Sequence, residues 1–368
     1  MKNVKVITRH SVANYGSLLQ TYATQRTLEK LGYQTEIINY IPKEEQSWYL
    51  AFVRFKVREF SSQNGIKQLL FFLSQIVNYS FSYFMFKKFR SKLVKETALY
   101  SSLDELKSNP PPADIYLTGS DQVWGKIANQ PYDKAFFLDF VPPGKKCVAY
   151  SASFGTETTH IPTSDLKQLV QKYSSLNVRE LSAVRILKEL GFENCNHVLD
   201  PTLLLTREDW KSMAAKKIRH QKYVLVYQLH QNREFEAYAE AFGKMKGLRV
   251  LRLSCSMNSI LQKGNLVYMT SPATFLRYFM DAEYVLTDSF HATVFSIIFN
   301  KQFICISPGS TSTRMLSILK VFELEDRMLD NFQNFHWQEK TIDFTPVNAK
   351  LKSMQDDSLQ HLAQSLVH

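Results

Sequence analysis

The stretch Tyr284-Val285-Leu286-Thr287-Asp288-Ser289-Phe290-His291-Ala292-Thr293 passes directly from an apolar strand pattern into a helix pattern. His291 lies where that helix begins. The first turn of a helix carries unpaired backbone N–H groups and the positive end of the helix dipole, so it binds anions. A histidine there binds phosphate or transfers a proton near neutral pH. The simpler alternative is that Ser289 only caps the helix while His291 makes a local hydrogen bond.

Strand and helix patterns alternate on both sides of this junction. Near the N-terminus we expect a strand at 4–8, a helix at 17–31 and a second strand at 35–40. Such a βαβ unit predicts a parallel sheet. The alternation continues with strands expected at 114–118, 147–151, 176–178, 223–228, 249–253, 266–268 and 303–306. Further helices are expected at 164–173 (capped by Ser164), 182–190, 234–246, 273–280, from about 314, and at 347–367.

A break in the alternation indicates how the chain is divided into domains. Residues 198–222 have the pattern of a strand end, a turn and a basic segment with weak periodicity, so a domain boundary is expected there. We predict an α/β fold with two Rossmann-like domains and a ligand cleft between them. The predicted boundaries are 1–205, with a helical insertion at about 45–98, then 206–345, and a surface helix at 346–368.

The composition is typical of a globular intracellular protein. A chain of 368 residues with 45% hydrophobic residues is long enough for two cores. Its four cysteines have no C-x-x-C spacing, which argues against a zinc site or a disulfide framework and fits a reducing compartment. Residues 1–7 have a strand pattern rather than that of a signal peptide, so a cytoplasmic location is expected.

The formal net charge of +11 is concentrated in the insertion. Residues 47–95 contain nine Lys or Arg, a single acid, Glu59, and many interleaved aromatic residues. This composition fits nucleic acid or an anionic membrane surface. No nucleic-acid motif accompanies it, so we favour a peripheral location at the inner face of a membrane.

An uncharged run at 68–86 is too polar for a transmembrane helix, and a helical pair lying at the interface is expected instead. The alternative, that these helices only pack on their own domain, is equally compatible with the pattern.

Several stretches at strand ends carry polar residues, and three of them also contain glycine. They are 14–20 (Asn-Tyr-Gly-Ser-Leu-Leu-Gln), 119–124 (Gly-Ser-Asp-Gln-Val-Trp), 150–155 (Tyr-Ser-Ala-Ser-Phe-Gly), 178–180 (Val-Arg-Glu), 199–204 (Leu-Asp-Pro-Thr-Leu-Leu) and 287–291. In this order they resemble the polysaccharide pyruvyl transferase family, and the helix with Arg314 resembles the family's last arginine-containing helix. The match covers most of the chain outside the insertion and the final helix. Ala292 departs from the glycine that is common in the family.

The resemblance implies a GT-B-type enzyme. Such an enzyme moves pyruvate from phosphoenolpyruvate onto a sugar of a cell-surface polysaccharide, or of its lipid-linked precursor. A ketal forms and phosphate is released. Phosphoenolpyruvate is the donor substrate, and no cofactor, metal ion or nucleic acid is expected.

The donor carries a carboxylate and a phosphate, so its site requires fixed positive charge. Arg314 can bind the carboxylate with two parallel hydrogen bonds, and His291 can hold phosphate and supply a proton. We also expect Ser289, Phe290 and Arg179 to bind the donor. Arg314 could instead be a surface residue at a helix start, and Arg179 could form an ion pair with its neighbour Glu180.

On the acceptor side, Asp121 follows a strand end and could accept the proton of the attacking hydroxyl group. Its alternative role is a turn or helix cap. The other residues expected to bind the acceptor are Asn14, Tyr15, Gly16, Gln122 and Trp124, although Gly16 could serve only a turn and Trp124 could equally belong to the core. His10 and His230 also lie near strand ends, with weaker support.

Two other functions remain open at this point. A GT-B-type glycosyltransferase with a nucleotide-sugar donor would require an acidic residue in the second domain to bind the nucleoside. A non-catalytic glycan-binding or membrane-binding relative is the other alternative, and the joint presence of His291, Asp121 and Arg314 argues against it.

Overall fold

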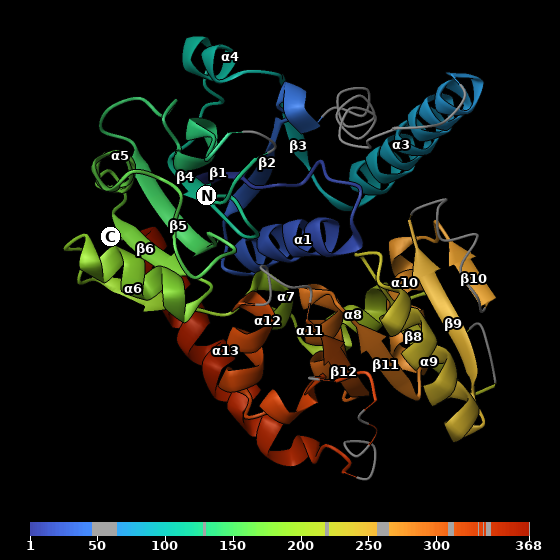
Figure 1. Cartoon of the computed structure of the whole chain (residues 1–368). Helices are drawn as coiled ribbons and strands as arrows, with labels where there is room; N and C mark the ends of the chain where they lie inside the picture. The colour runs from blue at the N-terminus through green and yellow to red at the C-terminus, as the bar shows by residue number, and fades with distance from the viewer. Residues whose placement is uncertain are drawn as a thin grey trace.

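The computed structural model describes residues 1–45, 65–127, 130–217, 221–255, 265–307, 313–329, 331–333, 335 and 340–367. In this part of the chain the strands form two sheets (Figure 1). The first sheet has the order β3-β2-β1-β4-β5-β6-β7 and the second has the order β10-β9-β8-β11-β12-β13. All pairings between these strands are parallel, which confirms the prediction from the βαβ pattern.

The first domain contains seven described strands: β1 (Asn3–Ile7), β2 (Gln34–Tyr40), β3 (Glu96–Tyr100), β4 (Ile115–Thr118), β5 (Lys146–Ala152), β6 (Ser175–Val178) and β7 (Cys195–His197). Its helices are α1 (Tyr15–Lys30), α3 (Gly65–Leu93), α4 (Leu103–Ser108), α5 (Thr163–Val170), α6 (Leu181–Glu189) and α7 (Pro201–Leu204). The inner strand β4 is buried along its whole length, as expected for a parallel strand covered on both faces.

The second domain contains six described strands: β8 (Tyr223–Tyr227), β9 (Arg249–Ser254), β10 (Asn265–Tyr268), β11 (Tyr284–Thr287), β12 (Gln302–Ile306) and β13 (Met328–Leu329). Its helices are α8 (Arg207–Met213), α9 (Arg233–Lys246), α10 (Pro272–Asp281), α11 (Phe290–Ile298) and α12 (Thr313–Val321). Helix α9 shows typical end signals, because Asn232 caps its first turn and Gly247 ends it in the left-handed conformation.

Several local predictions are wrong. Ser164 does not cap α5, because Pro162 occupies the cap position and the helix already begins at Thr163. The segment read as a weakly patterned boundary contains α7 and α8, where Thr206 and Asp209 form a reciprocal capping box. Strand β3, at the end of the predicted insertion, is an edge strand of the first sheet.

Helix α13 (Phe344–Val367) joins the second domain back to the first. Its Gln355 donates to the carbonyl of Leu203, and its Ser358 accepts from the backbone N–H of Leu199. Nearer the C-terminus, Asn177 of β6 donates to Ser365 Oγ at 2.8 Å. The helix is therefore more than the surface element that its polar sequence predicts (Figure 1).

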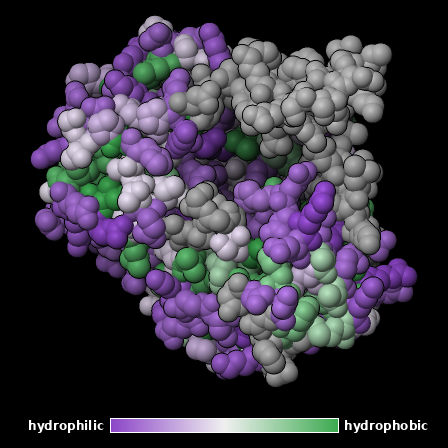
Figure 2. All heavy atoms as spheres, in the orientation of Figure 1, coloured by the Kyte–Doolittle hydropathy of each residue, from purple (hydrophilic) through white to green (hydrophobic). Residues whose placement is uncertain are grey.

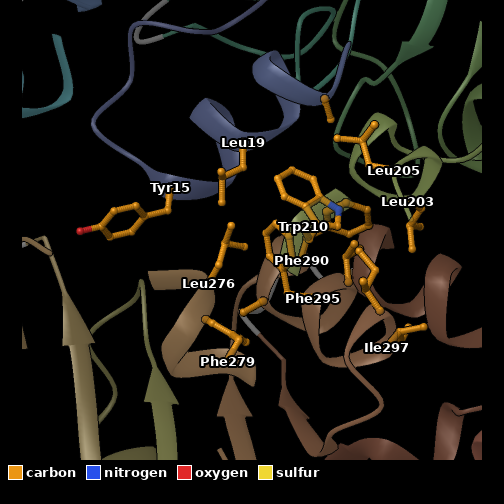
Figure 3. Packing of buried hydrophobic residues seen from close by; sticks show 14 of the residues in the cluster. Tyr15, Leu19, Leu203, Leu205, Trp210, Leu276, Phe279, Phe290, Phe295 and Ile297 are labelled. Atoms are coloured by element: carbon orange, nitrogen blue, oxygen red, sulfur yellow. The ribbon is translucent and has the colours of Figure 1, made fainter. Parts of the chain in front are cut away.

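One hydrophobic cluster extends across both domains. Figure 3 shows Leu19 of α1 facing the second domain, with Trp210 of α8 and Phe295 of α11 close by. The ring of Tyr15, at the start of α1, stacks on Phe275 of α10 with centroids 4.4 Å apart. The N-terminal part of α1 is thus fixed against the second domain by apolar packing.

The described part of the insertion is one helix, α3; residues 46–64 of the predicted basic and aromatic insertion lie outside the described residues, so the helical pair stays a prediction. One basic residue of the insertion, Arg90, is buried and donates to Glu96 at 2.7 Å, so it is a structural residue. None of the helices in the described part of the chain is both long enough and apolar enough to cross a bilayer.

Candidate active site

A cavity of about 230 Å³ lies between the two domains, and the surface is visibly hollowed there (Figure 2). The first domain contributes Arg9, Val12, Asn14, Ser17, Asp121 and Gln122 to its lining. The second domain contributes Leu229, His230, Asp288, Ser289, Phe290, His291, Arg314 and Met315.

The sheet topology explains why the cavity is there. Most of the lining residues follow the carboxyl ends of β1, β4, β8 and β11, or lie on the helices after them. In the first sheet the strand order reverses between β1 and β4, and in the second sheet it reverses between β8 and β11. Ligands of open α/β sheets bind at such switch points, and here the two switch points face one cavity.

Asp121 is surrounded by cations and by Ser17. Ser17 Oγ donates to Asp121 Oδ2 at 2.8 Å, while Arg179 Nη2 and Arg314 Nη1 each lie 3.7 Å from Oδ1. Burial would raise the pKa of Asp121, but the surrounding cations, Arg179 first, hold that pKa at about 2. The carboxylate is therefore ionised at neutral pH and is a weak proton acceptor in the unliganded site.

A glycine fixes the loop that carries Asp121. Gly119 has φ +138°, and a Cβ atom there would lie 1.8 Å from the carbonyl oxygen of Tyr150. No other residue fits this position. Asp121 itself has φ +73°, a conformation that aspartate tolerates better than most residues.

Arg314 presents a cation whose charge is only partly compensated. Its Nη2 and Nε atoms lie 3.1 Å and 3.3 Å from the Gln122 amide oxygen, in the amide orientation that satisfies both groups. In the described chain, no carboxylate lies within hydrogen-bond distance of its guanidinium. Burial, and then the charge of Arg179, lowers the pKa of Arg314. An anion bound in the cavity would relieve this unfavourable environment.

His291 lies between the carboxylate of Asp200 and the backbone of Gly16. Its Nε2 is buried 3.7 Å from Asp200 Oδ2, and it has no hydrogen-bond partner among the described residues. Burial would raise the pKa of Asp200, but its interaction with His291 and then Arg179 lowers it. On the other side, a Cβ atom at Gly16 would lie 2.3 Å from His291 Nδ1. Only a glycine at position 16 therefore leaves room for the ring.

The N-terminus of α11 has no side-chain cap among the described residues and can bind an anion. Ser289 occupies the cap position but makes no side-chain capping hydrogen bond, so the simple capping role is wrong. The helical hydrogen-bond ladder begins with Thr293 N donating to Ser289 O. The N–H groups of the first turn precede this bond, and Ser289, Phe290 and His291 all line the cavity.

His230 and Asp288 form a second imidazole–carboxylate pair in the cavity wall. His230 Nδ1 lies 3.0 Å from Asp288 Oδ2, and Asp288 also accepts from the backbone N–H groups of Leu229 and His230. The hydrogen bond to Asp288 raises the pKa of His230. The His230 side chain is 56% exposed, so a protonated imidazole is accessible to a ligand.

Four of the predicted ligand-binding residues do not line the cavity. Arg179 is buried behind it, with Nε bound to Glu180 and Nη1 bound to Asp200, so the structure confirms its ion-pair alternative and places it outside the cavity lining. Gly16 does not line the cavity but makes room for His291.

The two aromatic residues predicted to bind the acceptor belong to the core. Trp124 is 1% exposed and stacks on Phe137 at 5.3 Å, so it has no free face for a sugar. Tyr15 is also 1% exposed, and its hydroxyl group donates to the carbonyl of Thr270. Both side chains are buried by packing, so neither reaches the cavity.

Several residues that the structure brings to the site were not predicted from the sequence. Arg9 lines the cavity and forms an ion pair with Glu45 at 2.8 Å. Asp200 lies next to His291, with Oδ2 3.7 Å from Nε2. Its position in a loop at a strand end is the sequence feature that could have identified it. Ser17 is a polar residue in the first turn of α1. Within the described residues, no three His, Cys, Asp or Glu side chains are grouped to bind a metal ion.

The family model for polysaccharide pyruvyl transferase matches residues 14–310, most of the chain. The chain belongs to this family. Membership in the polysaccharide pyruvyl transferase family implies a saccharide acceptor. A search of curated proteins finds no match.

Solved structures similar to this pyruvyl transferase family member show its fold. A putative UDP-N-acetylglucosamine 2-epimerase from Listeria monocytogenes is 12% identical, with a TM-score of 0.52, covering 99% of this chain and 90% of its own. The UDP-GlcNAc 2-epimerase from Neisseria meningitidis, bound to UDP-GlcNAc, is 11% identical with a TM-score of 0.52, and the alignment covers 100% of both chains. These likenesses confirm the predicted GT-B-type arrangement of two Rossmann-like domains.

Proposed function

We propose that the cavity binds phosphoenolpyruvate and that the enzyme transfers its pyruvyl group to hydroxyl groups of a saccharide. A ketal forms and phosphate leaves. The observation that carries this proposal is the placement of Arg314 and the uncapped N-terminus of α11 around the same small cavity.

The two anionic groups of the donor match these two features. The first-turn N–H groups of α11 and the Ser289 hydroxyl group would bind phosphate. Arg314 would bind the carboxylate through its planar fork of N–H donors. Once the donor compensates Arg314, the pKa of Asp121 would rise from its low value, and the carboxylate would become a better proton acceptor.

The cavity fits a small donor better than a nucleotide sugar. Its volume of about 230 Å³ is below the ~300–1,000 Å³ of pockets for larger ligands. In the described part of the second domain, Asp288 is the acid that lines the cavity, and both of its oxygens already accept hydrogen bonds. It is therefore poorly placed to bind a ribose, as a nucleotide-sugar enzyme would require.

The chemistry assigns a role to each group. His291 would donate a proton to the methylene carbon of phosphoenolpyruvate, which makes the neighbouring carbon electrophilic. A first sugar hydroxyl group attacks that carbon and loses its proton, with Asp121 as the acceptor. A second hydroxyl group then displaces phosphate, and its proton leaves with the phosphate. The two C–O bonds of the ketal replace the C=C π bond and the C–O bond to phosphate.

Polar groups of the first domain would hold the saccharide. Asn14 uses its side-chain oxygen to cap α1, accepting from Gly16 N at 2.7 Å, which leaves its NH₂ group for a sugar hydroxyl. Gln122, which already contacts Arg314, lines the same wall and would couple acceptor binding to donor binding. The acceptor would be an oligosaccharide or a lipid-linked saccharide.

The direct test is incubation with phosphoenolpyruvate and synthetic or lipid-linked saccharides, with phosphate release and product mass as readouts. We expect one phosphate released per product, and a product heavier by one pyruvyl ketal. A product heavier by a hexose, formed only with a nucleotide sugar, would replace this proposal with the glycosyltransferase alternative. Ligand binding without any turnover would favour the non-catalytic alternative.

The raised pKa of His230 predicts a pH dependence of donor binding. His230 stays protonated up to a higher pH than an ordinary histidine, because Asp288 stabilises the charged form. We expect KM for phosphoenolpyruvate to be low below this pKa and to rise with pH above it, as the cation is lost. Asp288→Asn should move the rise to lower pH, and His230→Gln should remove it from the KM profile. An unchanged profile in His230→Gln would exclude this residue from donor binding.

A further inference from the structure

Helix α3 carries an exposed apolar stripe. Leu73, Val77, Phe81 and Phe84 are 48%, 60%, 44% and 63% exposed. At 100° per residue their spacing places them within about 80° of the helix circumference. The opposite face carries Phe86, which is 1% exposed and packs on Tyr15. The stripe is therefore the outward face of a helix that is fixed to the protein along its other side.

Basic residues continue this face toward the C-terminal end of the helix. Lys87, Lys88 and Lys92 are exposed and follow Phe84 within about two turns. Across the described part of the chain, none of the three makes an ion pair. The sequence of α3 contains no acidic residue at all. The stripe and the lysines thus form one apolar and cationic face, which we call the α3 face.

The position of α3 makes this face accessible. The helix projects beyond the two sheets at the edge of the molecule (Figure 1). Its 29 residues correspond to a length of about 44 Å. Ser82 donates to the carbonyl of Cys255 at 3.2 Å, which fixes the helix to the second domain as well. Phe81 stacks on Tyr268 and still keeps nearly half of its surface exposed.

We propose that the α3 face binds the surface of an anionic lipid bilayer. Phenylalanine and aliphatic side chains enter the boundary between headgroups and acyl chains, and the neighbouring lysines remain at the level of the negative headgroups. A second copy of this chain is a poorer occupant, because the face offers no carboxylate to compensate the lysines of its partner. The inference concerns where the enzyme lies and does not depend on which group it transfers.

The test is co-sedimentation of the full-length protein with vesicles, without substrate. We expect binding to phosphatidylcholine vesicles that contain about one-third phosphatidylglycerol, and much weaker binding to pure phosphatidylcholine. Each lysine contributes about fivefold, so the variant K87Q/K88Q/K92Q should lose on the order of 100-fold in affinity. V77S/F84S should lose at least about tenfold, because two exposed apolar anchors are removed without disturbing the buried face.

Matched controls separate this surface from general charge and hydrophobicity. K188Q/K216Q/K217Q has the same net charge as the triple variant, and L181S/M245S removes two exposed apolar side chains elsewhere. Both should bind vesicles like the unmodified protein. Equal loss in a control and in its α3 counterpart would overturn the proposal, as would binding to pure phosphatidylcholine at full strength.

Oligomeric state gives a second readout. If V77S/F84S changes the molar mass in solution from dimer to monomer and leaves vesicle binding unaltered, the face is a contact between copies and the proposal is wrong. Because no phosphoenolpyruvate is present, neither result bears on the proposed transfer reaction. Confirmed vesicle binding would favour the lipid-linked form of the acceptor, since the enzyme and its acceptor would then lie on the same membrane surface.

Discussion

Arg314→Lys is expected to lower kcat/KM for phosphoenolpyruvate by about 10²-fold, and Arg314→Ala by about 10³-fold or more. Lysine keeps the charge but cannot form the two parallel hydrogen bonds that a guanidinium makes with a carboxylate, and each charge-assisted hydrogen bond is worth roughly 1.5–3 kcal/mol. Alanine removes the charge as well, so the loss is larger. The measurement is a steady-state titration of phosphoenolpyruvate with phosphate release as the signal.

The fold should survive these substitutions. In the described residues Arg314 makes no short ion pair, and its nearest carboxylate oxygen, on Asp121, is 3.7 Å away. The matched control is Arg185→Lys, at a side chain that is 56% exposed and paired with Glu157 on the surface. It should leave kcat/KM unchanged. Normal kinetics in Arg314→Lys would remove this residue from the donor site.

Gly16→Ala is expected to reduce kcat by about 10²-fold or more and to destabilise the protein by about 1–3 kcal/mol. Alanine is normally the better helix residue by about 1 kcal/mol, so the opposite sign needs a specific cause. That cause is His291, whose Nδ1 and Cγ atoms would lie 2.3 Å and 2.6 Å from the new Cβ atom. The ring must move, and its alignment with the donor is lost. Urea unfolding and single-turnover kinetics measure the two effects.

A double-mutant cycle isolates this contact. His291→Ala alone should abolish turnover while the protein stays folded. In that background the two ring contacts are gone and only the 2.9 Å contact with the Cβ atom of residue 291 remains, so Gly16→Ala should destabilise the protein much less than when the histidine is present. The loss of most of the destabilisation is the decisive result. Equal destabilisation in both backgrounds would show that the glycine serves the backbone of α1 and not the histidine.

Much of the fold could be predicted because the alternation of strands and helices is regular. The parallel sheets and the strand-to-helix junction at His291 follow directly from periodicity. Helix α8 was missed because its seven residues contain few apolar positions, and its start is set by a local capping box. The return of α13 to the first domain depends on contacts with residues such as Asn177, 188 positions away in the chain.

The site was predicted in part for a similar reason. Polar residues at strand ends converge in a parallel fold, which identified Asp121, Ser289, His291 and Arg314 as cavity residues. Sequence position does not reveal which way an aromatic ring points, so Trp124 was assigned to the acceptor although it packs in the core.

Support for His230 as a site residue was weak in the sequence for a different reason. Its orienting partner, Asp288, lies 58 residues away, and two helices and three strands of the described chain come between them. The raised pKa of His230 depends on this long-range contact. No local pattern records such a pair, and only the neighbouring positions of β8 and β11 in the sheet bring the two residues together.

The way in which α13 and the shared core tie the domains together has a mechanical consequence. Domains linked by one flexible connection usually hinge, but a large apolar interface suppresses such motion. Here one continuous core includes residues of α1, α10, α11 and α13. The two domains that line the cavity are therefore already held in position, and little binding energy is spent on closing them around the donor.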